Sequence, residues 1–210
     1  MQYQRLDSET TDFVFETTDL DEIIRTSVKK YARQFIAKKI SLSYEPVGVA
    51  VITDKKWLSF VIEQVISNAV KYTKTGSIKI YLEDGDGTMS VPLQKNSHGK
   101  GDSEENGSTN SVRLVIEDTG IGIRTEDLPR VFERGFTGYN GRQEHKSTGI
   151  GIRAEDLPRI CEMGYTGCNG HGGQHSSGIG LYLCSRILKK LGHTFSITSK
   201  EGEGTVVKIG

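Results

Sequence analysis

The chain has 210 residues, of which 35 % are apolar and 26 % are charged, a composition that can bury the core of one globular domain. Its 27 Lys and Arg residues balance its 27 Asp and Glu residues, so charge does not indicate a nucleic-acid partner, and we expect none. Three irregularly spaced cysteines argue against a disulfide framework, and no apolar run is long enough to span a bilayer.

The first 75 residues predict two amphipathic helices, the first preceded by one strand and the second by two. Asp19 and Asp54 stand where an N-capping side chain is needed, and apolar residues then recur at helical spacing. Residues 13–18 alternate between apolar and polar as a strand does. The expected elements in chain order are a strand at 13–18, a helix at 20–38, strands at 40–44 and 47–53, and a helix at 55–72.

The remaining chain alternates apolar strands with glycine-rich stretches. Residues 85–110 are polar and rich in Gly, Ser and Asn, and we expect a mobile, dispensable insertion there. The expected elements are strands at 77–82 and 112–117, an irregular stretch at 119–177, a helix at 179–191, and a hairpin of strands at 195–199 and 205–209. Together they predict an α/β (α+β) two-layer sandwich, with helices covering one face of a mixed sheet.

A tandem repeat occupies the glycine-rich stretch. Residues 119–147 recur at 148–176, and 18 of the 29 positions are identical. Two copies are too few for a solenoid, which usually needs three or more stacked units. We therefore interpret the repeat as a duplicated surface segment, since the entropy of loop closure grows only logarithmically with loop length.

The helix at 55–72 has a polar stripe. Gln64, Asn68, Lys71 and Tyr72 are spaced so that they lie along one side of the helix. The opposite side is apolar and predicted to face the core: Leu58, Ile62, Val65, Ile66 and Ala69. A stripe of this kind is either a functional surface or an ordinary solvated face, and the helix alone leaves both interpretations open.

Two glycine motifs stand at the two ends of the repeat. In the first, Asp118 ends an apolar strand and precedes Gly120 and Gly122, so a carboxylate stands beside a backbone that a flat ring could approach. The second opens the last helix, where free N–H groups and the helix dipole favour an anion. Its residues are Ser177, Gly178, Gly180 and Leu181. Singly, these motifs could also be an Asp-containing turn and an N-cap.

A metal site is a weaker interpretation of the second repeat copy. Cys161, Cys168, His171 and His175 are separated by seven, three and four residues. Zinc sites usually place their cysteines in closely spaced pairs. The spacing therefore does not favour zinc.

Taken together and in order, these motifs resemble the GHKL superfamily of ATP-binding domains, and more closely bacterial sensor histidine kinases of the bacitracin-sensing, intramembrane-sensing branch. FVIEQVISNAVKYT (60–73) is similar to their N box and IEDTGIGI (116–123) to their first glycine box. RVFERGFTGYNGR (130–142), SSGIGLYLCSRI (176–187) and SKEGEGTVVKI (199–209) are similar to the F box, second glycine box and terminal hairpin. The resemblance covers nearly the whole chain and implies the Bergerat ATP-binding fold.

The resemblance implies a role for each motif residue. Asn68 would bind Mg²⁺, Lys71 would neutralise phosphate charge, and Tyr72 would pack near the adenine. Asp118 would bind the adenine amine with support from Thr205. The remaining roles are shared: Gly120 and Gly122 would shape the adenine floor, and Ser177, Gly178, Gly180 and Leu181 would form the phosphate end. Gln64 replaces a second asparagine or a general base, and a neutral amide suits phosphate transfer better than hydrolysis.

Two features depart from the family pattern. The repeat adds 29 residues to the segment that covers the nucleotide, giving two F-box-like stretches at 132–136 and 161–165. Asp118 precedes only the first copy and an apolar helix follows only the second, so we expect Asp118 to act with Gly178–Leu181. In addition, none of the five histidines lies in a sequence like the family's phosphoacceptor helix. Residues 1–12 could form the tail of that helix.

The implied activity is transfer of the γ-phosphate of ATP to a histidine of a dimerisation domain, with a response regulator downstream and, by resemblance, an ABC-type transporter as partner. The implied location is the cytoplasmic part of a membrane-anchored bacterial protein, with residues 13–210 as its catalytic domain. Two alternatives remain: a stand-alone GHKL kinase or ATPase acting in trans, and a degenerate pseudokinase that serves as a binding module.

Overall fold

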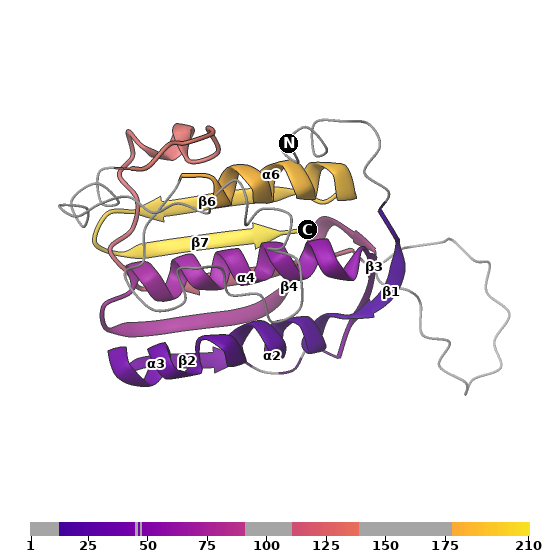
Figure 1. Cartoon of the computed structure of the whole chain (residues 1–210), viewed down its shortest axis with the longest axis horizontal. Coiled ribbons are helices and arrows are strands. Elements are labelled where there is room, and N and C mark those ends of the chain that lie inside the picture. Colours follow the sequence, from indigo (N-terminus) through magenta and orange to yellow (C-terminus); the bar gives the residue numbers. More distant parts are fainter. Residues whose placement is uncertain (1–12, 45, 47, 91–110, 139–177) are drawn as a thin grey trace, which may run out of the picture.

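The computed structural model describes residues 13–44, 46, 48–90, 111–138 and 178–210 (Figure 1). Residues 1–12, the part of the predicted insertion from 91 to 110, Ser177 and most of the repeat lie outside the described residues, and so do the cysteines and histidines of the zinc interpretation. Within the described part, no helix is both long and apolar enough to cross a membrane.

The fold is the predicted sandwich of helices on a mixed sheet. Five strands pair in the order β2-β4-β5-β7-β6, with β2 and β4 parallel and the other neighbours antiparallel. Helices α2, α4 and α6 lie together in one layer (Figure 1). The elements of the sheet are β2 (Ile40–Tyr44), β4 (Gly76–Ser90), β5 (Ser111–Asp118), β6 (Phe195–Lys200) and β7 (Gly204–Ile209). The helices are α2 (Leu20–Lys30), α3 (Ala32–Lys38), α4 (Lys55–Tyr72) and α6 (Gly180–Leu191), and strands β1 (Glu16–Asp19) and β3 (Ala50–Thr53) form a separate antiparallel pair.

The core lies between the helix layer and the sheet. The apolar side of α4 is buried, as its spacing predicts, and α6 buries Leu183, Ile187, Leu188 and Leu191 against it. Asp19 and Asp54 both cap their helices, accepting backbone N–H groups of the first turn. These apolar stripes hold α4 and α6 side by side.

The helix predicted at 20–38 is interrupted, which corrects the sequence expectation. Tyr31 leaves the helical conformation, with φ −101° and ψ 4°. Its N–H bonds to Val28 only three residues back, and its hydroxyl bonds to Ser67 of α4. Because the break involves a single residue and a tighter turn, the apolar spacing continues across Tyr31. The sequence pattern therefore gives no sign of the break.

Three strands also differ from expectation at their ends. β1 begins at Glu16, because its partner β3 ends at the paired residue Thr53 before α4 starts. β3 begins at Ala50, two residues after Gly48, whose φ of +64° interrupts extended backbone. β4 continues to Ser90, further into the segment 85–110 than predicted, because it resumes pairing with β5 after a register shift.

Candidate nucleotide-binding site

Asp118, at the end of β5, is a buried acid. Its side chain is 8 % exposed, and Oδ1 accepts the N–H of Gly120 at 2.9 Å. The backbone N–H of Thr205, its partner on β7, also donates to the carboxyl group. Burial nevertheless raises the pKa of Asp118 from 3.8 to about 6, and a buried carboxylate of this kind is typical of a functional site.

The glycine turn after Asp118 lies against the end of α4. A methyl group at Gly120 would lie 2.6 Å from the carbonyl oxygen of Tyr72 and 2.9 Å from Oγ1 of Thr73. That hydroxyl is fully buried and has no hydrogen-bond partner among the described residues. A bare backbone, a desolvated carboxylate and an unsatisfied hydroxyl therefore meet at one place, as expected where a polar ligand binds.

Thr73 was not found by sequence reasoning. It follows the last residue of α4, and nothing in the local pattern distinguishes it from an ordinary helix-ending residue. Only its tertiary contact with the Gly120 turn identifies it, because that contact joins residues 47 positions apart in sequence.

The terminal hairpin braces the same turn from the other side. Gly122 has a φ of +69°, and a methyl group there would collide with the carbonyl oxygen of Lys200. Ser199 Oγ accepts the N–H of Ile123 at 2.8 Å and lies 2.9 Å from Oγ1 of Thr205. Thr205 thus supports Asp118 through its backbone, while its hydroxyl contacts Ser199, a bracing residue that sequence reasoning missed.

The polar stripe of α4 is half-buried rather than fully solvated and connects the two glycine motifs. At its C-terminal end, the carbonyl of Tyr72 accepts the N–H of Ile121 at 3.1 Å. The ammonium of Lys71 lies 5.2 Å from the centre of the Tyr72 ring. About two turns towards the N-terminus, Gln64 carbons lie 3.1 Å from the position of a methyl group at Gly180. Asn68 lies on the same side between them.

The first repeat copy supplies the contact to the start of α6 that the structure describes. Gly135 donates its N–H to the carbonyl of Gly178 at 3.0 Å. Gly178 has a φ of +65°, and a methyl group there would lie 2.5 Å from the carbonyl oxygen of Phe136. Phe132 packs on Phe195 of β6, with ring centres 5.1 Å apart. The F-box-like stretch 132–136 is therefore docked on the domain.

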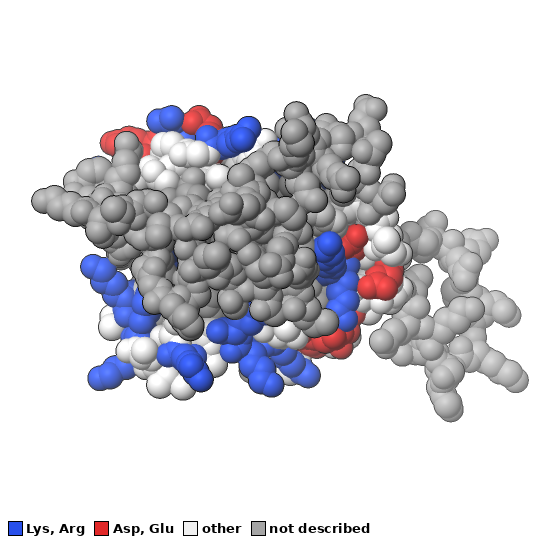
Figure 2. All heavy atoms as spheres, viewed as in Figure 1, with Lys and Arg blue, Asp and Glu red and all other residues white. Residues whose placement is uncertain are grey.

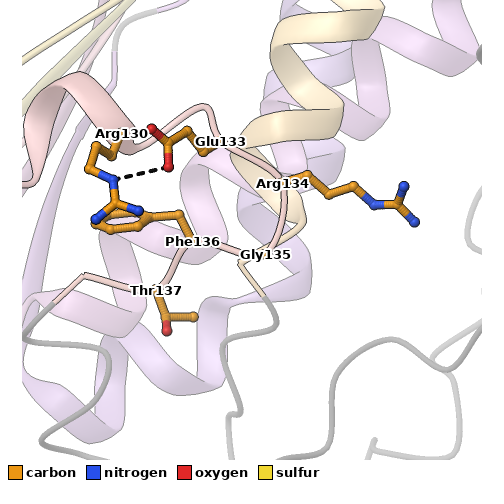
Figure 3. Close-up of a pocket in the computed structure, with 6 residues that line it drawn as sticks. All are labelled: Arg130, Glu133, Arg134, Gly135, Phe136 and Thr137. Atoms are coloured by element: carbon orange, nitrogen blue, oxygen red, sulfur yellow. Dashed lines mark hydrogen bonds and ion pairs between the residues drawn. The ribbon is translucent and has the colours of Figure 1, made fainter.

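A small polar hollow lies within this stretch. Its volume is about 220 Å³, and it is lined by Arg130, Glu133, Arg134, Gly135, Phe136 and Thr137. Arg130 stacks on the ring of Phe136, with 4.5 Å from its guanidinium carbon to the ring centre, and pairs with Glu133, whereas Arg134 points away from both (Figure 3). The hollow thus contains two arginines, and its Gly135 bonds to Gly178 just before α6.

Among the described residues, no cluster of three or more His, Cys, Asp or Glu side chains could hold a metal ion. Of the stripe residues, Gln64 and Asn68 each offer an amide carbonyl oxygen of the kind that Mg²⁺ accepts.

Comparison with known families decides the identity of the fold. The model of the family described as histidine kinase-, DNA gyrase B-, and HSP90-like ATPase matches residues 53–149 and again residues 140–210. The chain belongs to this ATPase family. The matches to the family model overlap at 140–149, where the first repeat copy ends and the second begins.

Individual relatives of this ATPase domain include sensor kinases. It is 31 % identical to sensor histidine kinase YxdK of Bacillus subtilis (strain 168), covering 98 % of this chain and 48 % of that protein. It is 28 % identical to sensor protein kinase GraS of Staphylococcus aureus (strain JH1), covering 98 % and 44 %. The chain thus spans about half the length of the curated relatives it matches. The predicted resemblance to sensor histidine kinases is confirmed.

Solved structures show the same fold. Full-length ShkA in complex with AMPPNP superposes with a TM-score of 0.61 at 16 % identity, covering 99 % of this chain and 33 % of that one. The catalytic domain of histidine kinase ThkA gives 0.58 at 17 % identity, covering 94 % of each chain. The predicted two-layer GHKL sandwich is therefore confirmed.

Proposed function

We propose that this domain binds Mg²⁺-ATP and transfers the γ-phosphate to a histidine of a dimerisation domain in two-component signal transduction. The observation that carries the proposal is the meeting of three motifs far apart in sequence. The Asp118–Gly122 turn lies on the end of α4 at Tyr72 and Thr73, and the start of α6 lies on Gln64 of the same helix. Adenine and phosphate contacts are thus offered along a single helix side.

In this proposal each group has a chemical task. The Asp118 carboxylate accepts a hydrogen bond from the adenine amine, and Thr205 holds that carboxylate in place. Gly120 and Gly122 let the turn pack closely against Tyr72 and Lys200, and the turn so held shapes the adenine floor. The remaining residues serve the phosphate end: Asn68 as metal ligand, Lys71 as counter-charge, Gln64 as a neutral positioning amide, and Ser177, Gly178, Gly180 and Leu181 at the helix N-terminus.

The adenine end fits its proposed ligand on two structural grounds. The Thr73 hydroxyl is buried without a hydrogen-bond partner among the described residues, and the carboxyl group of Asp118 is desolvated by burial. ATP supplies the transferable phosphoryl group when bound. The chain itself contributes binding, orientation and charge, which are the main means by which proteins promote phosphoryl transfer.

The proposed partners follow from the resemblance to sensor kinases. They are the phosphoacceptor dimerisation domain, a response regulator and, by the resemblance to the bacitracin-sensing branch, an ABC-type transporter. The proposal also assigns the domain to the cytoplasmic side of a membrane-anchored bacterial protein.

Replacing the proposed metal ligand tests the function. Asn68→Ala should remove the affinity gained on adding Mg²⁺ and lower phosphate transfer by about 100-fold or more, because charge stabilisation by a metal contributes several kcal/mol. Calorimetric titration of ATP with Mg²⁺ and with EDTA, followed by transfer to a purified phosphoacceptor domain, measures both effects. Lys56→Ala, at the exposed start of the same helix, is the control.

Other outcomes of this experiment favour the alternatives. Hydrolysis of ATP without transfer to the histidine domain would indicate a stand-alone ATPase. Absence of any Mg²⁺-dependent affinity in the parent domain would indicate a pseudokinase that serves as a binding module.

Excising residues 148–176 tests the interpretation of the repeat as a duplication. The excision joins Ser147 to Ser177 and keeps every described contact between the stretch 132–136 and Gly178. We expect the shortened domain to bind ATP at least as tightly as the parent and to transfer phosphate faster. The reason is that Ser147–Gly151 no longer competes with Ser176–Gly180 as a phosphate loop, whereas loop length itself costs only about 0.6 kcal/mol per doubling.

Unfolding of the excised domain, or loss of its ATP binding, would show that the second copy is an integrated structural element. Thermal unfolding and ATP titration of the excised domain and the parent distinguish these results.

A further inference from the structure

Basic side chains gather along the edge of the molecule formed by α2 and α3 (Figure 2). Between residues 25 and 39 there are six Lys and Arg residues and no Asp or Glu. Five of the six are exposed: Arg25, Lys29, Lys30, Arg33 and Lys39. Lys38 is the exception, because its side chain is half-buried and turned towards α4.

Lys38 ends α3 and binds the C-terminal end of α4. Its ammonium donates to the carbonyl oxygens of Val70 at 2.7 Å, Lys71 at 3.0 Å and Thr73 at 3.3 Å. A lysine ammonium has three N–H donors, so these acceptors match its full capacity. The last carbonyls of a helix lack intrahelical partners and carry partial negative charge, which makes a cation there favourable.

The other carbonyls of this helix end are bound as well. The carbonyl of Ala69 accepts the N–H of Thr73 at 3.0 Å, and that of Tyr72 accepts the N–H of Ile121 at 3.1 Å. Lys38 and the glycine turn therefore hold neighbouring carbonyls of the same last turn. That turn carries Lys71 and Tyr72, and it presents the Thr73 hydroxyl to Gly120.

We propose that Lys38 is a positioning residue of the nucleotide site, acting by fixing the end of α4. The inference rests on the proposed nucleotide-binding function. Without the ammonium, the carbonyls of Val70, Lys71 and Thr73 need other donors, and the last turn frays towards solvent. Fraying withdraws the Tyr72 carbonyl from Ile121 and so displaces the floor on which the adenine lies.

The experiment compares Lys38→Met, which keeps the length of the stem, with Lys38→Arg, which keeps charge and N–H donors. We expect Mg²⁺-ATP affinity to fall about tenfold in Lys38→Met, because hydrogen bonds to charged groups contribute more than neutral ones. Lys38→Arg should recover most of that loss. Lys29→Met, which removes an exposed lysine of the same basic edge, should bind as the parent does.

Amide hydrogen exchange separates positioning from general stability. In Lys38→Met the amides of Thr73 and Ile121 should exchange faster, while those of β5 and β7 keep their protection. If Lys38→Met does not fold, Lys38→Gln, with a single amide donor group, should show a smaller increase in hydrogen exchange at the same two amides.

Unchanged exchange at Ile121, or equal loss of protection throughout the sheet, would overturn the proposal. Unchanged ATP affinity in a Lys38→Met domain whose parent binds ATP would overturn it too. Failure of the parent to bind Mg²⁺-ATP would instead refute the proposed function, and the exchange of Ile121 would still decide whether Lys38 fixes the helix end.

Discussion

Asp118→Asn should stabilise the nucleotide-free domain at pH 7.5 and at the same time weaken ATP binding about 100-fold, because hydrogen bonds to a charged acceptor contribute about 1.5–3 kcal/mol. The loss of affinity follows from the proposed contact to the adenine amine. The gain in stability follows from burial, which raises the pKa of Asp118 to about 6 in the folded domain. Ionised Asp118 therefore opposes folding at neutral pH.

The sign of this effect gives it a distinctive pH dependence. Because the folded-state pKa lies above the ordinary value of 3.8, the stability contributed by Asp118 is full below about pH 4 and is lost as the pH rises through about 6. The asparagine side chain of the variant cannot ionise, so the free energy of unfolding of the variant should exceed that of the parent by about 1–2 kcal/mol at pH 7.5. This difference includes a partial offset, because an amide accepts fewer backbone N–H groups than a carboxylate does.

Thermal unfolding of both proteins from pH 4 to pH 8, with ATP titration at pH 7.5, measures the two effects. The difference in unfolding free energy should disappear near pH 4. Ser147→Ala, at the position before the second repeat copy, is the control for nucleotide binding and should leave affinity unchanged. Comparable losses of ATP affinity from the two substitutions would show that the adenine contact is wrongly assigned to Asp118.

Gly204→Ala should cause a large loss of stability. Gly204 has a φ of +122°, and a methyl group there would collide with the carbonyl oxygen of Asp118 and lie 3.0 Å from Cα of Thr119. Left-handed strain of about 1–2 kcal/mol then adds to overpacking of about 1–3 kcal/mol, giving an expected loss of about 3 kcal/mol or more. ATP affinity should fall as well, because Asp118 must move.

Gly202→Ala is the matched control for this substitution. Gly202 lies in the same hairpin with a φ of +81°, but a methyl group there meets nothing within 4 Å. It should cost only the backbone strain, about 1–2 kcal/mol, and leave ATP affinity near that of the parent. Urea unfolding gives both free energies. Equal losses in the two variants would show that backbone strain, and not contact with Asp118, governs this hairpin.

The elements of the core could be predicted from the sequence because their signals are local. The spacing of Leu58, Ile62, Val65 and Ile66 places one side of α4 in the core, and Asp54 begins the helix at the expected residue. The apolar strand before Asp118 and the apolar helix after Gly180 are equally plain in the pattern. Because these motifs also occur in a fixed order, the family could be recognised before any contact was known.

The contacts that assemble the site could not be predicted, because they join residues that are distant in sequence. The carbonyl of Tyr72 meets the N–H of Ile121, and Lys38 binds the end of a helix more than thirty residues further on. Nothing local distinguishes Lys38 from the five exposed basic residues around it. The break at Tyr31 is hidden for a related reason, since it leaves the apolar spacing intact.

The sequence by itself therefore determined the layers of the fold, the order of the motifs and the existence of a duplicated segment, because periodicity, capping and repetition are properties of neighbouring residues. Only the tertiary structure decided that Gly135 of the first copy contacts Gly178, that Thr73 faces Gly120 and that Lys38 holds the end of α4. Those choices depend on which backbone N–H and carbonyl groups remain without partners once the helices have packed on the sheet, and each such group must then find a donor or acceptor in space.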